Sequence, residues 1–214
     1  MKKLISIACL AAILALPVIA AESVRFPPIP PDQLNAQQKA FAKALTDSPR
    51  AGNVNNAPFK VYLRSPEFAT HAIAMSDYLR WGTGMEPRLT ELAIIIAARN
   101  WTSDYIWHAH YPLAVKGGLD PKVGAAIAAG QRPTGMKDDE AIVYDFLTQI
   151  YRDKNVSDAT YAATVKRFGE KGVTDLIGLA SYYGITAMAL ITANAPTAPG
   201  DEPKLQRLAQ AFPK

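Results

Sequence analysis

The sequence predicts an all-α fold, a bundle of several helices. Apolar residues recur at three- and four-residue intervals through most of the chain, which is the spacing of buried helix faces. No stretch shows the sustained alternation of apolar and polar residues, bounded by turns, that half-buried strands show. Several of the periodic segments also begin with capping residues, which are typical of helix N-termini. The expected helices, in chain order, span about 36–46, 66–80, 87–101, 103–117, 121–130, 137–153, 157–169 and 173–193, with a short helix over 205–212.

The starts of these helices carry signals of known physical origin. Asn35 and Gln38 form a capping box, in which each side chain accepts a hydrogen bond from the other residue's backbone. Ser-Pro and Asp-Pro pairs begin the helices at 66 and 121, because the first residue caps and proline fits the first turn. Thr102 or Ser103 caps the helix that follows Trp101. Proline at position 87 opens the helix before it in the same way.

Breaks between the helices are marked mainly by glycine. Gly82, Gly130 and Gly169 follow periodic segments, where glycine commonly ends a helix. Residues 47–58 contain Pro, Gly and several Asn and are predicted to form a loop.

The N-terminus has the pattern of a secretory signal peptide. Lys2 and Lys3 precede an apolar stretch from Leu4 to Ile19, and small or modest residues before Ala21 suit cleavage there. We therefore expect residues 1–20 to be a signal peptide. Residues 21–214 then form a single domain, with a Pro-rich N-terminal lead-in and a C-terminal tail. The exported chain would be periplasmic, and it would contain no thiol because Cys9 is the only cysteine.

The composition makes several kinds of partner unfavourable. Removal of Lys2 and Lys3 lowers the formal charge of +4 by two, and no Lys/Arg run follows, so nothing indicates nucleic-acid binding. Residues 176–195 carry no charge and are long enough to span a membrane. Hydroxyl groups and glycines interrupt this stretch, and no basic residue flanks its C-terminal end. We interpret it as a buried central helix or an oligomer interface, with no membrane contact after signal cleavage.

One spacing points to a family. Glu91 is followed after twelve residues by Ser103, after three more by Ile106, and after four more by His110. This arrangement resembles the site of the carboxymuconolactone decarboxylase and alkylhydroperoxidase-D-like superfamily, in which a Glu, two Cys and a His have these positions. Ser103 and Ile106 replace the two Cys. Peroxidase chemistry through a disulfide needs a thiolate, so the sequence excludes a thiol peroxidase of that kind.

The resemblance extends from about residue 26 to residue 199. The runs that carry it, besides the spacing, are Leu63-Arg64-Ser65-Pro66-Glu67, Tyr78-Leu79-Arg80, Pro87-Arg88-Leu89-Thr90-Glu91 and Tyr105-Ile106-Trp107-His108-Ala109-His110. It implies an alkylhydroperoxidase-D-like helical bundle that assembles as a homotrimer or homohexamer, with sites near subunit interfaces and no cofactor. Decarboxylase-like members often have Glu where Ile106 stands, so this chain lacks one acid that they have.

Glu91 and His110 are the predicted catalytic pair. On a helix with about 100° per residue, His110 shares a face with Ser103, Ile106 and Trp107, and histidine exchanges protons near neutral pH. Glu91 is expected to act as a general base or as a proton relay to His110. The alternatives are a histidine that is only hydrogen-bonded within the bundle and a structural ion pair between Glu91 and Arg88.

Other side chains are expected to contact the substrate. Arg88 and Arg99 fall on the face of Glu91, where they would lower the pKa of its carboxyl group and hold a substrate carboxylate. Tyr105 and Trp107 would form aromatic walls, although core packing is an equal alternative for Trp107. His108 completes the expected contacts.

A metal site is not favoured. His108 and His110 point about 200° apart on one helix and cannot chelate the same ion from it. His71 is remote in sequence and has no paired ligand.

The sequence thus predicts a cofactor-independent lyase, a decarboxylase, or an isomerase that acts on a small organic acid or lactone. The main alternative is a non-catalytic periplasmic binding or assembly protein with the same fold, and a metal-dependent enzyme is a weaker one. The enzyme and the non-catalytic protein can be distinguished by whether Glu91 and His110 face one pocket that solvent can reach.

Overall fold

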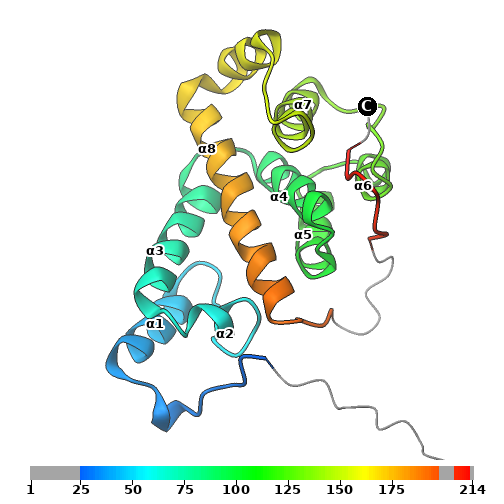
Figure 1. The fold of residues 1–214 in the computed structure, drawn as a ribbon. Coiled ribbons are helices and arrows are strands. Elements are labelled where there is room, and N and C mark those ends of the chain that lie inside the picture. The colour runs from blue at the N-terminus through cyan, green and yellow to red at the C-terminus, as the bar shows by residue number, and fades with distance from the viewer. Residues whose placement is uncertain (1–24, 198–204, 213–214) are drawn as a thin grey trace, which may run out of the picture.

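The computed structural model describes residues 25–197 and 205–212, and within them it contains eight α-helices and no strand. The prediction of an all-α, multi-helix fold is therefore confirmed (Figure 1). The proposed signal peptide lies outside the described residues. The helices are α1 (Ala36–Asp47), α2 (Phe59–Tyr62), α3 (Pro66–Asp77), α4 (Pro87–Trp101), α5 (Asp104–Lys116), α6 (Pro121–Ala128), α7 (Asp138–Asp153) and α8 (Asp158–Thr192).

Helix α4 is the centre of the bundle. Every residue from Arg88 to Arg99 is buried, because α4 packs against α5, α7 and α8 at once. A helix that is covered on all sides must place any charged residue against a partner inside the protein. Glu91 is such a residue, and its surroundings define the site described below.

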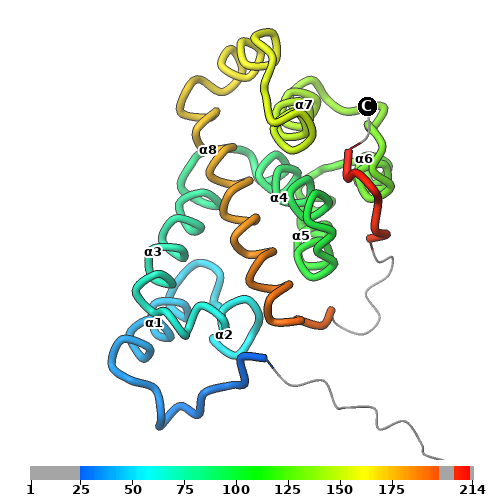
Figure 2. Tube along the Cα trace, viewed as in Figure 1, coloured from blue at the N-terminus to red at the C-terminus, as the bar shows by residue number. Residues whose placement is uncertain are grey.

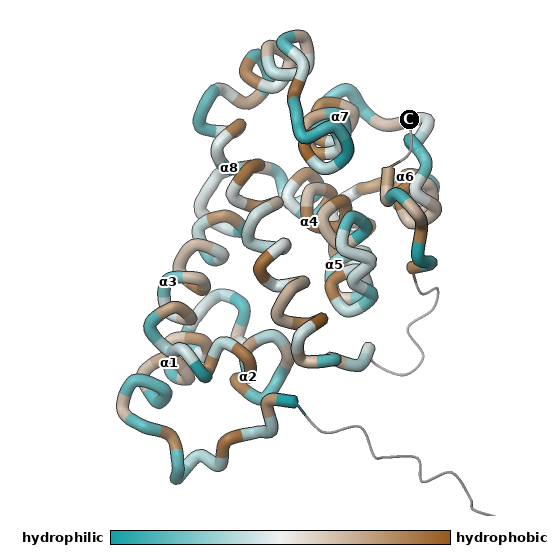
Figure 3. The backbone as a smooth tube through the Cα atoms, viewed as in Figure 1, coloured by the Kyte–Doolittle hydropathy of each residue, from teal (hydrophilic) through white to brown (hydrophobic). Residues whose placement is uncertain are grey.

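Helix α8 combines two of the expected helices. The side chain of Ser157 caps its start by accepting a hydrogen bond from the Thr160 backbone. The helix is broken at Gly169, where φ is 69° and ψ is 171°, in the left-handed region that glycine adopts without a steric penalty. The predicted break is thus present, and the apolar part of α8 follows it, in white to brown in Figure 3.

Among the described residues α8 is the one helix whose length and hydropathy would allow it to cross a membrane. In the fold, 61% of its most apolar window is buried against the rest of the chain. This burial supports the interpretation of residues 176–195 as a central helix of the bundle.

Three short helical elements were not predicted as separate elements. Helix α2 has four residues and no side-chain cap, so no capping signal marks it. A π-helix, η2 (Tyr78–Gly82), continues α3 directly with a wider turn. A further 3-10 turn, η1 (Pro31–Gln33), lies in the Pro-rich lead-in.

The expected helix over 205–212 is wrong, since this segment has no helical turn and runs beside α6 (Figure 2). Other elements hold it in place. Its backbone accepts a hydrogen bond from Arg99 at Gln206 (2.8 Å), and the amide of Leu205 donates to Asp104 (2.5 Å). Phe212 is buried against aromatic rings of α7. These long-range contacts outweigh the local preference for a helix.

Candidate functional site

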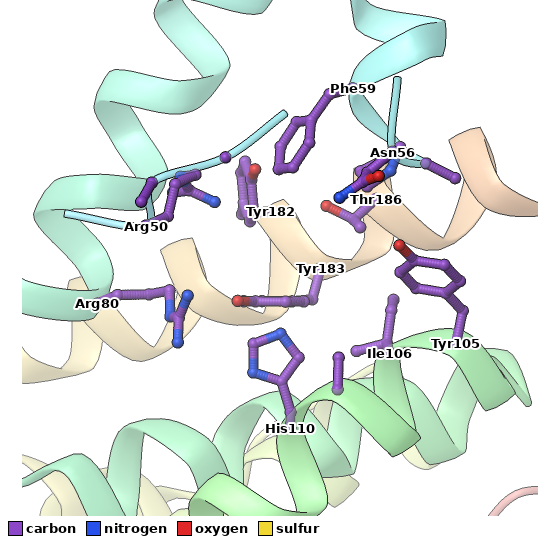
Figure 4. Close-up of a pocket in the computed structure, with 15 residues that line it drawn as sticks. Arg50, Asn56, Phe59, Arg80, Tyr105, Ile106, His110, Tyr182, Tyr183 and Thr186 are labelled. Carbon is purple, nitrogen blue, oxygen red and sulfur yellow. The ribbon is translucent and has the colours of Figure 1, made fainter. Parts of the chain in front are cut away.

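A pocket of about 270 Å³ lies between α5, α8, η2 and the loop that connects α1 to α2. Figure 4 shows the side chains that line it. They include two arginines, three tyrosines and one histidine, and none of the lining residues is acidic. The pocket therefore presents mainly hydrogen-bond donors and aromatic surfaces to whatever enters it.

Glu91 lies just behind this pocket and connects two of its lining residues. Its carboxylate accepts a hydrogen bond from Nη2 of Arg80 at 2.9 Å, and its other oxygen lies 2.6 Å from Nδ1 of His110. The predicted contact between Glu91 and His110 is thus present and direct. Burial alone would raise the pKa of Glu91, but the hydrogen bond from His110, together with the charge and hydrogen bond of Arg80, holds this pKa below its usual value. Glu91 is therefore ionised at neutral pH.

His110 lines the pocket from α5. Burial lowers the pKa of its imidazole below 6.5, and this effect outweighs the opposite one of the Glu91 carboxylate. The ring is therefore neutral at pH 7. An ionised carboxylate accepts hydrogen bonds only, so the proton of the neutral ring is on Nδ1, and Nε2 carries a lone pair. In the described part of the chain, no hydrogen bond engages Nε2, which leaves it able to accept a proton.

Tyr183 covers the imidazole from α8. The two rings meet edge to face, with centroids 4.9 Å apart and planes at 83°. Burial raises the pKa of the phenol far above its usual value of 10, so Tyr183 is a neutral hydroxyl donor. Figure 4 shows this hydroxyl directed toward Arg80. Tyr182 and Tyr183 belong to the stretch 176–195, which we interpreted as a buried central helix or an oligomer interface; both are buried, and both also line the pocket.

Sequence reasoning missed both arginines of the pocket. Arg80 comes from η2, and its guanidinium stacks on the ring of Trp81 at 4.4 Å. Arg50 comes from the loop after α1. Arg80 belongs to the run Tyr78-Leu79-Arg80, which is one of the runs that carry the family resemblance. The direction of its side chain, however, depends on a π-turn. Such a turn shifts the helix face relative to the normal period.

The structure corrects the roles expected for Arg88 and Arg99, because neither lines the pocket. Arg88 is turned toward α7, where it pairs with Asp139 at 2.9 Å and Glu140 at 2.6 Å, and the first of these partners contributes most to raising its pKa. Arg99 is fully buried, and its hydrogen bonds connect parts of the fold. It donates to the hydroxyl of Thr102 and to the carbonyls of Ala128 and Gln206. Both arginines thus stabilise the bundle, and Arg80 is the cation beside Glu91.

The aromatic residues of α5 divide between pocket and core. Tyr105 lines the pocket, as expected, and burial raises the pKa of its phenol. Trp107 does not: it is 2% exposed and stacks on Tyr111 with ring centroids 5.4 Å apart. Trp107 is therefore packed in the core, as the alternative has it, and does not line this pocket.

The remaining histidines also lie away from the pocket. His108, which was expected to contact the substrate, is not among the residues that line the pocket. Its Nε2 is buried and has no hydrogen-bond partner among the described residues. His71 is exposed on α3. Residues 25–197 and 205–212 contain no group of three or more His, Cys, Asp or Glu side chains placed to hold a metal ion.

The two positions that correspond to the Cys pair have different environments. Ser103 caps α5, and its hydroxyl lies 3.5 Å from the amide of Ile106. Ile106 is 2% exposed and contributes an apolar patch to the pocket wall.

Comparisons of the chain with protein-family models, with curated proteins and with solved structures find no match.

Proposed function

We propose that this protein is a cofactor-independent acid–base enzyme, a decarboxylase or isomerase of the carboxymuconolactone decarboxylase type, that acts on a small organic acid or lactone. The observation that carries the proposal is the 2.6 Å contact between Glu91 and His110 at the wall of a pocket. This contact orients a neutral imidazole so that Nε2 can act as the general base. The spacing of Glu91 and His110 and the all-helical fold agree with the resemblance described above.

The first step is a proton transfer. Nε2 of His110 removes a proton from a carbon next to a carbonyl group, and the electron pair of the broken C–H bond moves to the carbonyl oxygen. The ring of Tyr183 lies over the imidazole, and its hydroxyl, on the side of Arg80, is the donor that we assign to the resulting enolate. The imidazolium that forms is stabilised by the Glu91 carboxylate. Return of the proton to another carbon completes an isomerisation.

Decarboxylation uses the same groups in another order. The bond between carbon and the carboxylate breaks, CO2 leaves, and the electron pair enters the neighbouring carbonyl group as an enolate. A protonated His110 then gives its proton to carbon. Because burial lowers the pKa of His110, the resting imidazole is neutral, and the reaction that starts with proton removal is the one that it favours.

Export to the periplasm and assembly as a homotrimer or homohexamer are part of the same proposal. They are supported by the N-terminal sequence pattern and by the resemblance, respectively.

Turnover assays on ligands selected by binding test the function. Small lactones and carboxylic acids that raise the melting temperature of the protein are assayed for conversion with the original chain and with His110→Ala and Glu91→Gln. Loss of a general acid–base group should lower the rate by about a hundredfold or more in each variant while the fold is retained. His71→Ala, which removes an exposed histidine away from the pocket, is the matched control and should keep the original rate.

Saturable binding without turnover by the original protein would contradict the proposal and favour the non-catalytic binding protein. Equal rates in the original chain and in His110→Ala would also contradict it.

A further inference from the structure

Two arginines from distant parts of the sequence meet at one end of the pocket. Arg50 belongs to the loop after α1, and Arg80 belongs to η2. Figure 4 shows both side chains at the same end, with Tyr183 between Arg80 and the pocket interior. Trp81 lies against both guanidinium groups, at 5.5 Å from Arg50 and 4.4 Å from Arg80. Stacking on one indole restricts both cations to this end of the pocket.

Each guanidinium is also fixed by a carboxylate. Nε and Nη2 of Arg50 donate to Asp77 at 3.1 and 2.5 Å, and Nη2 also donates to the hydroxyl of Ser76 at 2.8 Å. Arg80 is held by Glu91 as described above. The side chains are 10% and 14% exposed, respectively. Both cations are therefore positioned before any ligand arrives, which lowers the entropy lost on binding.

Several donors of these two groups remain unused. No described residue accepts a hydrogen bond from Nη1 of Arg50 or Nη1 of Arg80, and Nε of Arg80 is buried without a partner. An arginine has five N–H donors, and buried donors are normally satisfied. Two largely buried guanidinium groups whose Nη1 atoms are unpaired among the described residues, one of them with a buried and unpaired Nε, are suited to an anion that supplies acceptors.

We infer that Arg50 and Arg80 together bind the carboxylate of a small monoanionic ligand at this end of the pocket. A planar carboxylate has two oxygens that match the fork of a guanidinium. None of the residues that line the pocket is acidic, so none of them would repel a carboxylate. The inference deepens the proposed function, on which it rests for the choice of pocket, by assigning the end at which the acid group of the substrate lies.

The opposite end indicates the rest of the ligand. Tyr105, Asn56 and Thr186 gather there, so that end offers neutral hydrogen-bonding groups rather than charges. Ile106 and Tyr183 form the walls between the two ends. The ligand class that fits is a flat, short carboxylate with a hydroxyl or carbonyl group at its far end.

The charges around the pocket predict a further property of this binding. Arg50 and Arg80 are balanced by Asp77 and Glu91, and His110 is neutral, so a monoanion adds an uncompensated negative charge. Protonation of His110 would compensate it. The groups that face His110 are Glu91 from α4, Arg80 from η2 and the neutral Tyr183 from α8, with Arg50 further away. Binding of a carboxylate should therefore be accompanied by proton uptake at His110 and should strengthen as the pH falls. A His110 that is protonated in this way is the acid that the decarboxylation route requires, and it is no longer a base.

Calorimetric titration of the full chain with benzoate and with benzamide tests the inference. Benzamide has the shape of benzoate without its charge, so benzoate should bind at least about tenfold more tightly, the difference expected for one charge-assisted hydrogen bond. The double variant Arg50→Gln/Asp77→Asn removes the ion pair as a unit and should weaken benzoate binding by at least about tenfold. Arg50→Lys keeps the charge beside Asp77 but loses the planar fork, and it should also bind benzoate more weakly. Arg132→Gln removes an exposed arginine outside the pocket and should bind benzoate as the original chain does.

Three results would overturn the inference: equal affinity for benzoate and benzamide, unchanged benzoate affinity in both Arg50 variants, or no binding of either compound at about 10 mM. The titration involves no turnover, so it separates the two proposals. Arginine-dependent binding of carboxylates, with no substrate found among them, would support the inference and count against the enzyme. Turnover of a ligand that binds equally well without Arg50 would support the enzyme and count against the inference.

Discussion

Replacing Glu91 by Gln is the substitution whose effect on stability is best defined by the structure. The Glu91 side chain is 9% exposed and contacts Arg80 at 2.9 Å and His110 at 2.6 Å. A hydrogen bond to a charged group contributes about 1.5–3 kcal/mol. Gln keeps one acceptor oxygen and turns an amide donor toward the other partner, so about one such bond is lost. The largely buried Arg80 guanidinium also loses its opposite charge. We expect the free energy of unfolding to fall by about 2–4 kcal/mol.

Urea denaturation at neutral pH, followed by circular dichroism, measures this loss. Asp145→Asn is the control, because Asp145 pairs with Arg132 on the surface, where the two side chains are 37% and 58% exposed. Breaking an exposed pair should cost less than about 1 kcal/mol. Similar losses in the two variants would refute the argument, because they would mean that the pair at Glu91 is as well solvated as a surface ion pair.

Further measurements test other parts of the account. Stability should decline as the pH falls below 6.5, because the low pKa of folded His110 means that the unfolded chain takes up a proton first; His110→Gln should remove this decline. A second decline should begin below 4.5, where the unfolded chain protonates Glu91 before the folded chain does, since the pKa of Glu91 is lowered by folding. Arg99→Met removes three hydrogen bonds of the fold and should lower the melting temperature while leaving turnover per folded molecule unchanged; lost turnover without lost stability would restore the substrate role. Light scattering should give the mass of a trimer or hexamer, and a monomer would contradict the oligomer.

Most of the fold was predictable because its helix boundaries are encoded locally. The capping box of Asn35 and Gln38, the cap at Ser157 and the break at Gly169 are all present where the sequence places them. Elements that depend on tertiary contacts were not predictable. The segment 205–212 has a helix-compatible sequence, but Arg99 and the aromatic rings of α7 hold it in an irregular conformation.

The candidate site was predictable only where spacing determines it. Glu91 and His110 lie on consecutive helices, and the helical periodicity places each of them on the face that is turned toward the other helix. Helical periodicity also places Arg88 on the face of Glu91, but in the structure Arg88 donates hydrogen bonds to Asp139 and Glu140 at the start of α7 instead. Arg80 occupies that place from η2. Neither the π-turn nor the course of the loop that carries Arg50 follows from helical periodicity.

His110 can act as the base only if its proton lies on Nδ1, and nitrogen NMR of the three histidines measures where this proton lies. The His110 signals are assigned by their loss in His110→Gln. At neutral pH we expect a neutral ring with its proton on Nδ1, hydrogen-bonded to Glu91, and an unprotonated Nε2 whose signal shifts when a carboxylate binds. A proton on Nε2 of a neutral ring, or an imidazolium that persists at neutral pH without ligand, would contradict the assignment of His110 as the base.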